Sequence, residues 1–74
     1  MIIVDTRQEK VIHPLIIALE AYFTTPKGKY LEIVFESNTD FGHLKDYLSS
    51  RSIGFREIYT GNELRLQVQK KNQG

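Results

Sequence analysis

The sequence predicts an α+β fold, a two-layer α/β sandwich in which two helices cover one face of a mixed four-stranded sheet. Two observations predict it. Apolar residues recur at helical spacing in two segments, and in four others they run together or alternate with polar residues. The six segments follow in the order β-α-β-α-β-β, and right-handed crossovers between parallel strands place both helices on the same face.

The first strand and the first helix are separated by a polar loop. Ile2-Ile3-Val4 is a short apolar run, typical of a strand covered on at least one face. Residues 5–10 are all polar and predict the loop, and Pro14 suits a first helical turn, where its missing N–H costs nothing. The apolar stripe of this helix is Leu15, Ala18, Leu19 and Tyr22. Residues 24–28 end it, because a proline and a glycine favour a turn.

The second half of the chain predicts a strand, a helix and a closing hairpin. Residues 29–36 alternate, which is typical of a half-buried strand. Residues 37–40 offer several N-caps for the second helix, and Gly54 is the residue expected just beyond its end. The apolar stripe of this helix is Phe41, Leu44, Tyr47 and Leu48. Gly61-Asn62 predicts a tight turn between two last strands, the first of which has room for a bulge.

Length and composition indicate one small domain, residues 1–70, followed by a polar tail at residues 71–74. Ten basic and nine acidic residues give a net charge of +1, which exerts no broad pull on nucleic acid or membrane. The chain has no cysteine, so disulfides, thiolate chemistry and cysteine-based zinc sites are excluded. We expect a cytoplasmic protein, because no segment resembles a signal peptide or a membrane span.

The opening stretch carries a family resemblance. Val4-Asp5-Thr6-Arg7 precedes Val11-Ile12-His13-Pro14 at the expected helix start, and Pro26-Lys27-Gly28 turns into the next strand. This pattern resembles the TusA/SirA family of small sulfur-carrier proteins, whose first strand ends in Leu-Asp-x-Arg-Gly and whose first helix begins at a C-P-x-P motif. Pro14 matches the second proline of that motif. Val11 stands at its cysteine, Ile12 at its first proline, and Gln8 at the earlier glycine.

The resemblance implies the family's βαβαββ fold and a protein-docking surface. In this family the cysteine carries a persulfide and passes it to a partner, and a helix N-terminus favours the thiolate that does so. Val11 cannot carry sulfur, and the chain has no other cysteine. We therefore expect a non-catalytic TusA/SirA-like protein. It would act as an interaction or regulatory partner linked to sulfur trafficking, as a monomer or weak dimer with a protein partner still to be identified.

We expect the partner-binding residues in this opening stretch. Val11 and Ile12 form an apolar pair with a polar rim, a composition that suits docking. For Asp5 a structural role is favoured, in which its carboxylate accepts hydrogen bonds from loop N–H groups. The full set of candidates is Asp5, Arg7, Val11, Ile12, His13 and Pro14.

The sequence predicts no catalytic residue, no cofactor and no metal site. An enzyme working through His13 lacks a second catalytic group placed beside it. Asp40, His43 and Asp46 follow one another at three-residue spacing on the second helix, but the first and last diverge around it. We interpret them as a solvated helix face.

The alternative function is a small RNA-binding or other nucleic-acid-binding module. Its basis is a set of basic residues that would form a cluster if the loop and the tail lie together: Lys27, Lys29, Lys70 and Lys71. Against it, the outer face of the sheet carries Glu32, Glu36 and Glu63, which repel phosphate.

Overall fold

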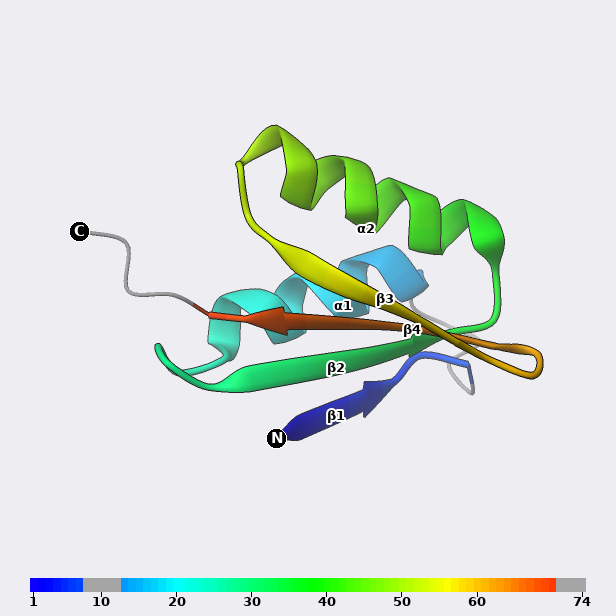
Figure 1. The fold of residues 1–74 in the computed structure, drawn as a ribbon, viewed down its shortest axis with the longest axis horizontal. Helices are drawn as coiled ribbons and strands as arrows, with labels where there is room; N and C mark the ends of the chain where they lie inside the picture. The colour runs from blue at the N-terminus through cyan, green and yellow to red at the C-terminus, as the bar shows by residue number, and fades with distance from the viewer. Residues whose placement is uncertain (8–12, 71–74) are drawn as a thin grey trace.

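The structure, a computed structural model, describes residues 1–7 and 13–70, and it confirms the predicted fold class and element order (Figure 1). Val11 and Ile12 and the predicted tail at residues 71–74 lie outside these residues. The strands are β1 (Ile2–Asp5), β2 (Tyr30–Phe35), β3 (Phe55–Thr60) and β4 (Glu63–Gln69), and the helices are α1 (Pro14–Thr24) and α2 (Asn38–Ser50).

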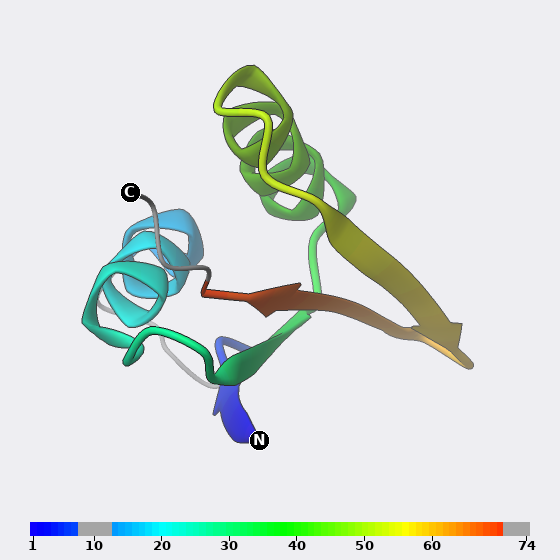
Figure 2. The same cartoon turned by 60° about the vertical axis from the view of Figure 1, so that its left-hand side comes forward.

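The four strands form one mixed sheet in the order β1-β2-β4-β3. β1 and β2 are parallel, and β4 lies between β2 and β3, antiparallel to both. The strand order leaves β1 and β3 as the two edges of the sheet. Both helices lie on the same side of the twisted sheet (Figure 2). This is the arrangement that right-handed crossovers require.

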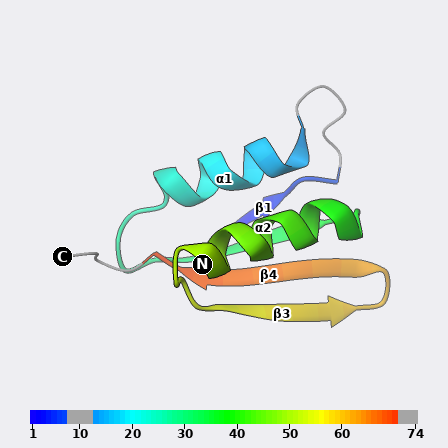
Figure 3. The same cartoon turned by 90° about the horizontal axis from the view of Figure 1, so that it is seen from above.

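The two helices run in the same direction, so the molecule has two unlike ends (Figure 3). We call the end that holds the N-termini of both helices and the β3–β4 turn the helix-start end. The opposite end holds the C-termini of both helices and the turn before β2, and we call it the helix-finish end. The N-terminal dipole charge is positive and the C-terminal charge negative, so the two ends suit side chains of opposite sign.

The core lies between the helices and the inner face of the sheet. Leu31, Ile33 and Phe35 are fully buried, as the alternation along β2 predicts, and Phe35 packs edge-to-face against Phe41. The predicted stripe of α2 is buried except Tyr47, which is only partly covered. The core residues are Ala18, Tyr22, Leu31, Ile33, Phe35, Phe41, Leu44, Leu48, Leu66 and Val68.

Two details of the turns differ from the sequence prediction. α2 ends at Ser50, and Ser52 takes the left-handed conformation at φ 58°, so Gly54 is not the terminating residue. β3 contains no bulge, because its pairing with β4 runs without interruption from Phe55 to Thr60. The predicted hairpin turn is confirmed, and a positive φ of 59° at Gly61 is typical of a type II′ turn. Neither described helix is long and apolar enough to cross a membrane.

Candidate functional site

Asp5 and Arg7 lie together at the end of β1. The Asp5 Oδ1 atom accepts hydrogen bonds from the backbone N–H and the Nε of Arg7, both at 2.9 Å, and Oδ2 accepts one from Nη2 at 2.7 Å. These bonds lower the pKa of Asp5 to about 2. The expected structural role of Asp5, accepting a loop N–H, is therefore observed.

Arg7 also reaches the start of β4, where a larger polar network begins. Its Nη1 atom donates to Oε2 of Glu63 at 2.9 Å, and the guanidinium of Arg65 donates to Oε1 of the same carboxylate at 2.8 and 3.1 Å. Arg65 and Gln67 both donate to Glu32. We call this set the outer-face network: Asp5, Arg7, Glu32, Glu63, Arg65 and Gln67.

Glu32 is not the exposed acid that the sequence predicts. Its side chain is only 8% exposed, because the long side chains of Arg65 and Gln67 lie across it. The hydrogen bond from Gln67 and the guanidinium of Arg65 hold the pKa of Glu32 below its usual value. Arg65, and then Arg7, do the same for the pKa of Glu63. Each carboxylate of the network is thus held ionised by partners inside the fold.

His13 is the N-cap of α1, and Pro14 is the first residue of that helix, as predicted. The Nδ1 atom of His13 accepts the N–H of Leu15 at 3.1 Å, so the ring proton resides on Nε2. Nε2 lies 3.4 Å from Oδ1 of Asp40 on α2. Both ring nitrogens are therefore engaged, and His13 cannot act as a base without giving up its helix cap.

Asp40 was expected on a solvated face, and that expectation is wrong. The residue is buried, because the parallel helices bring the first turn of α2 beside the start of α1. His43 and Asp46 are exposed, and no group of potential metal ligands occurs in residues 1–7 and 13–70.

The structure thus divides the predicted site into two pairs. Asp5 contacts Arg7, and His13 adjoins Pro14, but no hydrogen bond or ion pair among the described residues joins one pair to the other. Val11 and Ile12, the apolar part of the predicted site, lie outside those residues. Their role in docking stays a prediction.

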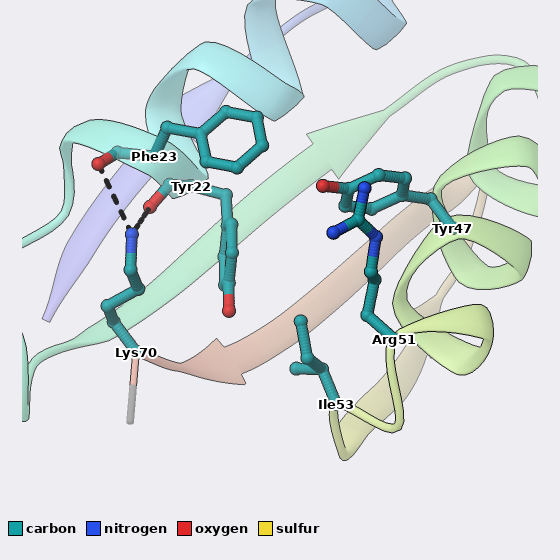
Figure 4. A pocket seen from close by; sticks show the side chains of 6 residues that line it. All are labelled: Tyr22, Phe23, Tyr47, Arg51, Ile53 and Lys70. Carbon is teal, nitrogen blue, oxygen red and sulfur yellow. Dashed lines mark hydrogen bonds between the residues drawn. The ribbon is translucent and has the colours of Figure 1, made fainter. Parts of the chain in front are cut away.

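Sequence reasoning missed a groove at the helix-finish end (Figure 4). It has a volume of about 350 Å³ and lies between the last turns of α1 and α2. Phe23 is exposed over more than half of its surface, and its ring meets that of Tyr47 edge-to-face at 6.3 Å. The residues that line the groove are Tyr22, Phe23, Tyr47, Arg51, Ile53 and Lys70. The one feature of the sequence that could have indicated the groove is Phe23, an aromatic residue beside the apolar stripe of α1.

Two cations flank these aromatic rings, and no carboxylate of residues 1–7 or 13–70 lines the groove. The Nζ of Lys70 donates to the backbone oxygens of Tyr22 and Phe23 at 2.8 and 3.2 Å and lies 4.5 Å from the centre of the Tyr22 ring. The guanidinium of Arg51 lies over the ring of Tyr47 at 5.1 Å. Lys70 therefore stabilises the negative end of α1, whereas Arg51 has only an aromatic face beneath it.

The last residue described at the C-terminus lies beside the turn before β2. The backbone oxygen of Lys70 accepts the N–H of Gly28, and its own N–H donates to the oxygen of Lys29 at 2.9 Å. Lys27 and Lys29 are exposed on this turn. The loop and the end of β4 therefore do lie together, as the basic cluster required, while Lys71 is outside the described residues.

No family model, no curated protein and no solved structure matches this chain. The resemblance of the opening stretch to the TusA/SirA family therefore rests on its own residues and enters the next section as a proposal.

Proposed function

We propose that the chain is a non-catalytic interaction domain of the TusA/SirA type. It acts in the cytoplasm as a protein-binding or regulatory partner linked to sulfur trafficking, without a persulfide relay of its own. One observation carries the proposal. The ionisable residues that match the family pattern, Asp5 and Arg7, and the neighbouring His13 are all held by hydrogen bonds within the fold.

The chemistry of this end of the molecule supports binding over reaction. Val11 has no nucleophilic atom, and the chain has no cysteine that could replace the missing thiol. His13 uses the lone pair of Nδ1 to cap α1, so it supplies no general base. What remains is an apolar pair in the sequence, Val11 and Ile12, with polar neighbours, and this composition suits docking.

Quantitative affinity capture from cells that express the chain natively tests this proposal. We expect a reproducible partner that is retained by the wild type and lost with Val11→Asp. Ile16→Asp is the matched control, because Ile16 is an exposed isoleucine of α1 outside the predicted docking stretch. The proposal fails if no partner is captured, or if the partner is retained equally by both variants.

The second candidate is binding of single-stranded nucleic acid, and the groove at the helix-finish end favours it. Exposed aromatic rings with adjacent cations stack bases and attract phosphates. Phe23 and Tyr47 provide the rings, and Arg51 provides a cation that pairs with no carboxylate of the described residues. Lys27 and Lys29 extend the positive charge. Two carboxylates of the acidic face, Glu32 and Glu63, are paired within the outer-face network, which reduces their repulsion of phosphate.

Fluorescence anisotropy with a short labelled single-stranded RNA tests the second candidate. Binding should weaken as salt rises, and Arg51→Gln should reduce affinity several-fold, whereas Lys45→Gln should not. Lys45 is a suitable control because its ammonium is already paired with Glu57. Absence of binding at low salt, or equal effects of the two variants, removes this candidate.

A further inference from the structure

β1 is an edge strand, and within the described part of the chain no strand pairs with its outward backbone groups. The N–H of Thr6 donates to the backbone oxygen of Val34 in β2. In a strand, successive residues direct their N–H and C=O groups to opposite sides, so even-numbered residues of β1 face β2. The N–H and C=O of Ile3 therefore point away from the sheet, at the centre of the four-residue strand.

The two edges of the sheet differ in their protection against pairing. Natural edge strands are commonly protected by charged residues or proline. β3 carries Arg56 and Glu57, and Lys45 of α2 reaches Glu57 at 3.1 Å. β1 reads Ile-Ile-Val-Asp and has only an acid at its last position. Ile2 is 40% exposed and Ile3 is 59% exposed.

We propose that β1 is a self-association edge, at which a second copy of this chain adds its own β1 in antiparallel orientation. A two-fold axis through Ile3 satisfies the geometry. Ile3 faces its own counterpart as a hydrogen-bonded pair, in which each N–H donates to the other C=O. Ile2 then lies opposite the second copy's Val4, and the two isoleucines at the axis cover each other on the outer face of the sheet.

The partner at this edge is a second copy of the chain because the strand complements itself. A two-fold axis normal to the sheet keeps all four helices on one face and joins the two sheets into one of eight strands. The apolar side chains of the strand meet apolar side chains, and the outward Ile3 groups find partners without any change in the β1–β2 ladder. A four-residue edge buries less area than a standard interface, so the dimer is weak and depends on concentration.

Sedimentation equilibrium between about 10 μM and about 1 mM tests the proposal. The average mass of the wild type should rise toward that of a dimer across this range, and Ile3→Lys should stay monomeric. Ile16→Lys is the matched control, because Ile16 is 57% exposed on α1. It lies seven residues before Phe23, which contacts Tyr47, so it shares the side of α1 that faces α2 and not the β1 edge.

Ile3→Pro separates strand pairing from general apolar adhesion. Proline removes only the outward N–H of this residue, and the bonds between β1 and β2 do not use that group. We expect Ile3→Pro to be folded by circular dichroism and monomeric at the highest concentration. A wild type that stays monomeric at about 1 mM overturns the proposal, as does a dimer that persists in Ile3→Pro or is lost equally in Ile16→Lys.

Discussion

The outer-face network and the aromatic groove use their cations in different ways. In the network, Arg7 and Arg65 each contact two carboxylates, and the buried Glu32 is held by Arg65 and Gln67. In the groove, Lys70 contacts backbone oxygens and Arg51 contacts a ring, and none of the described residues that line it is a carboxylate. In the outer-face network each cation is paired with carboxylates. In the groove the positive charge of Arg51 is not paired with a carboxylate of the described residues.

This difference shows that the net charge of the chain does not describe how charge is distributed over its surface. A chain with ten basic and nine acidic residues looks neutral on average. The acids of the outer-face network are paired where they stand, whereas no carboxylate among the described residues lines the groove at the helix-finish end. The network should therefore govern stability, and the groove should govern interactions with anions.

The largest expected effect comes from breaking the network. Arg65→Met should lower the midpoint of thermal unfolding by about 10 °C, because it removes the cation from the buried Glu32 and from Glu63. Arg51→Met in the groove should lower it by no more than about 3 °C, since only a ring contact is lost. Equal midpoints for the two variants, measured by calorimetry, would contradict the comparison.

Acid should weaken the network in a defined range of pH. The folded-state pKa of Asp5 is about 2, below its ordinary value of 3.8, so its stabilisation is complete above 3.8 and is lost as pH falls through 2. The lowered pKa values of Glu32 and Glu63 act in the same direction.

Urea denaturation at a series of acidic pH values measures this effect. The free energy of unfolding should fall as pH decreases below about 4. Asp5→Asn should be less stable than the wild type at neutral pH and should show a shallower decline. An unchanged pH dependence in this variant would mean that the Asp5–Arg7 contact does not persist in solution.

A smaller effect is expected at the start of α1. His13→Ala should cost about 1 kcal/mol of unfolding free energy, because the N–H of Leu15 loses its acceptor. His13→Asn should recover most of this loss, since asparagine also caps helices. His43→Ala is the matched control, because this second histidine is exposed on α2. A loss of equal size in the control would remove the capping role.

Much of the fold follows from local patterns in the sequence. The strand at residues 30–35, most of the stripe of α2 and the Gly61-Asn62 turn each depend on neighbouring residues, and they are confirmed. The expected half-burial of that strand is wrong, because Glu32 and Val34 on its outer face are buried as well. The burial of Glu32 depends on β4 lying next to β2, a pairing of distant segments that local patterns do not encode.

The candidate site was harder to predict, because it too depends on contacts between segments that are distant in the sequence. The contact of His13 with Asp40 and the groove between Phe23 and Tyr47 both depend on α1 and α2 running in the same direction. Spacing along one helix carries no information about the residues of the other. The contact of Asp5 with Arg7 could be predicted, because only one residue separates them.

In the function that we propose, the opening stretch has the form of a sulfur-carrier site without its sulfur atom. Val11→Cys tests it directly, because the chain has no other cysteine and the new thiol is the only one present. Its alkylation rate by iodoacetamide should be compared with that of Ile16→Cys, an exposed thiol further along α1. We predict that the thiol at position 11 reacts about threefold or more faster at neutral pH, since the proposed sulfur-carrier site would hold it near a helix start, which favours the thiolate. Equal or slower reaction at position 11 would contradict the claim.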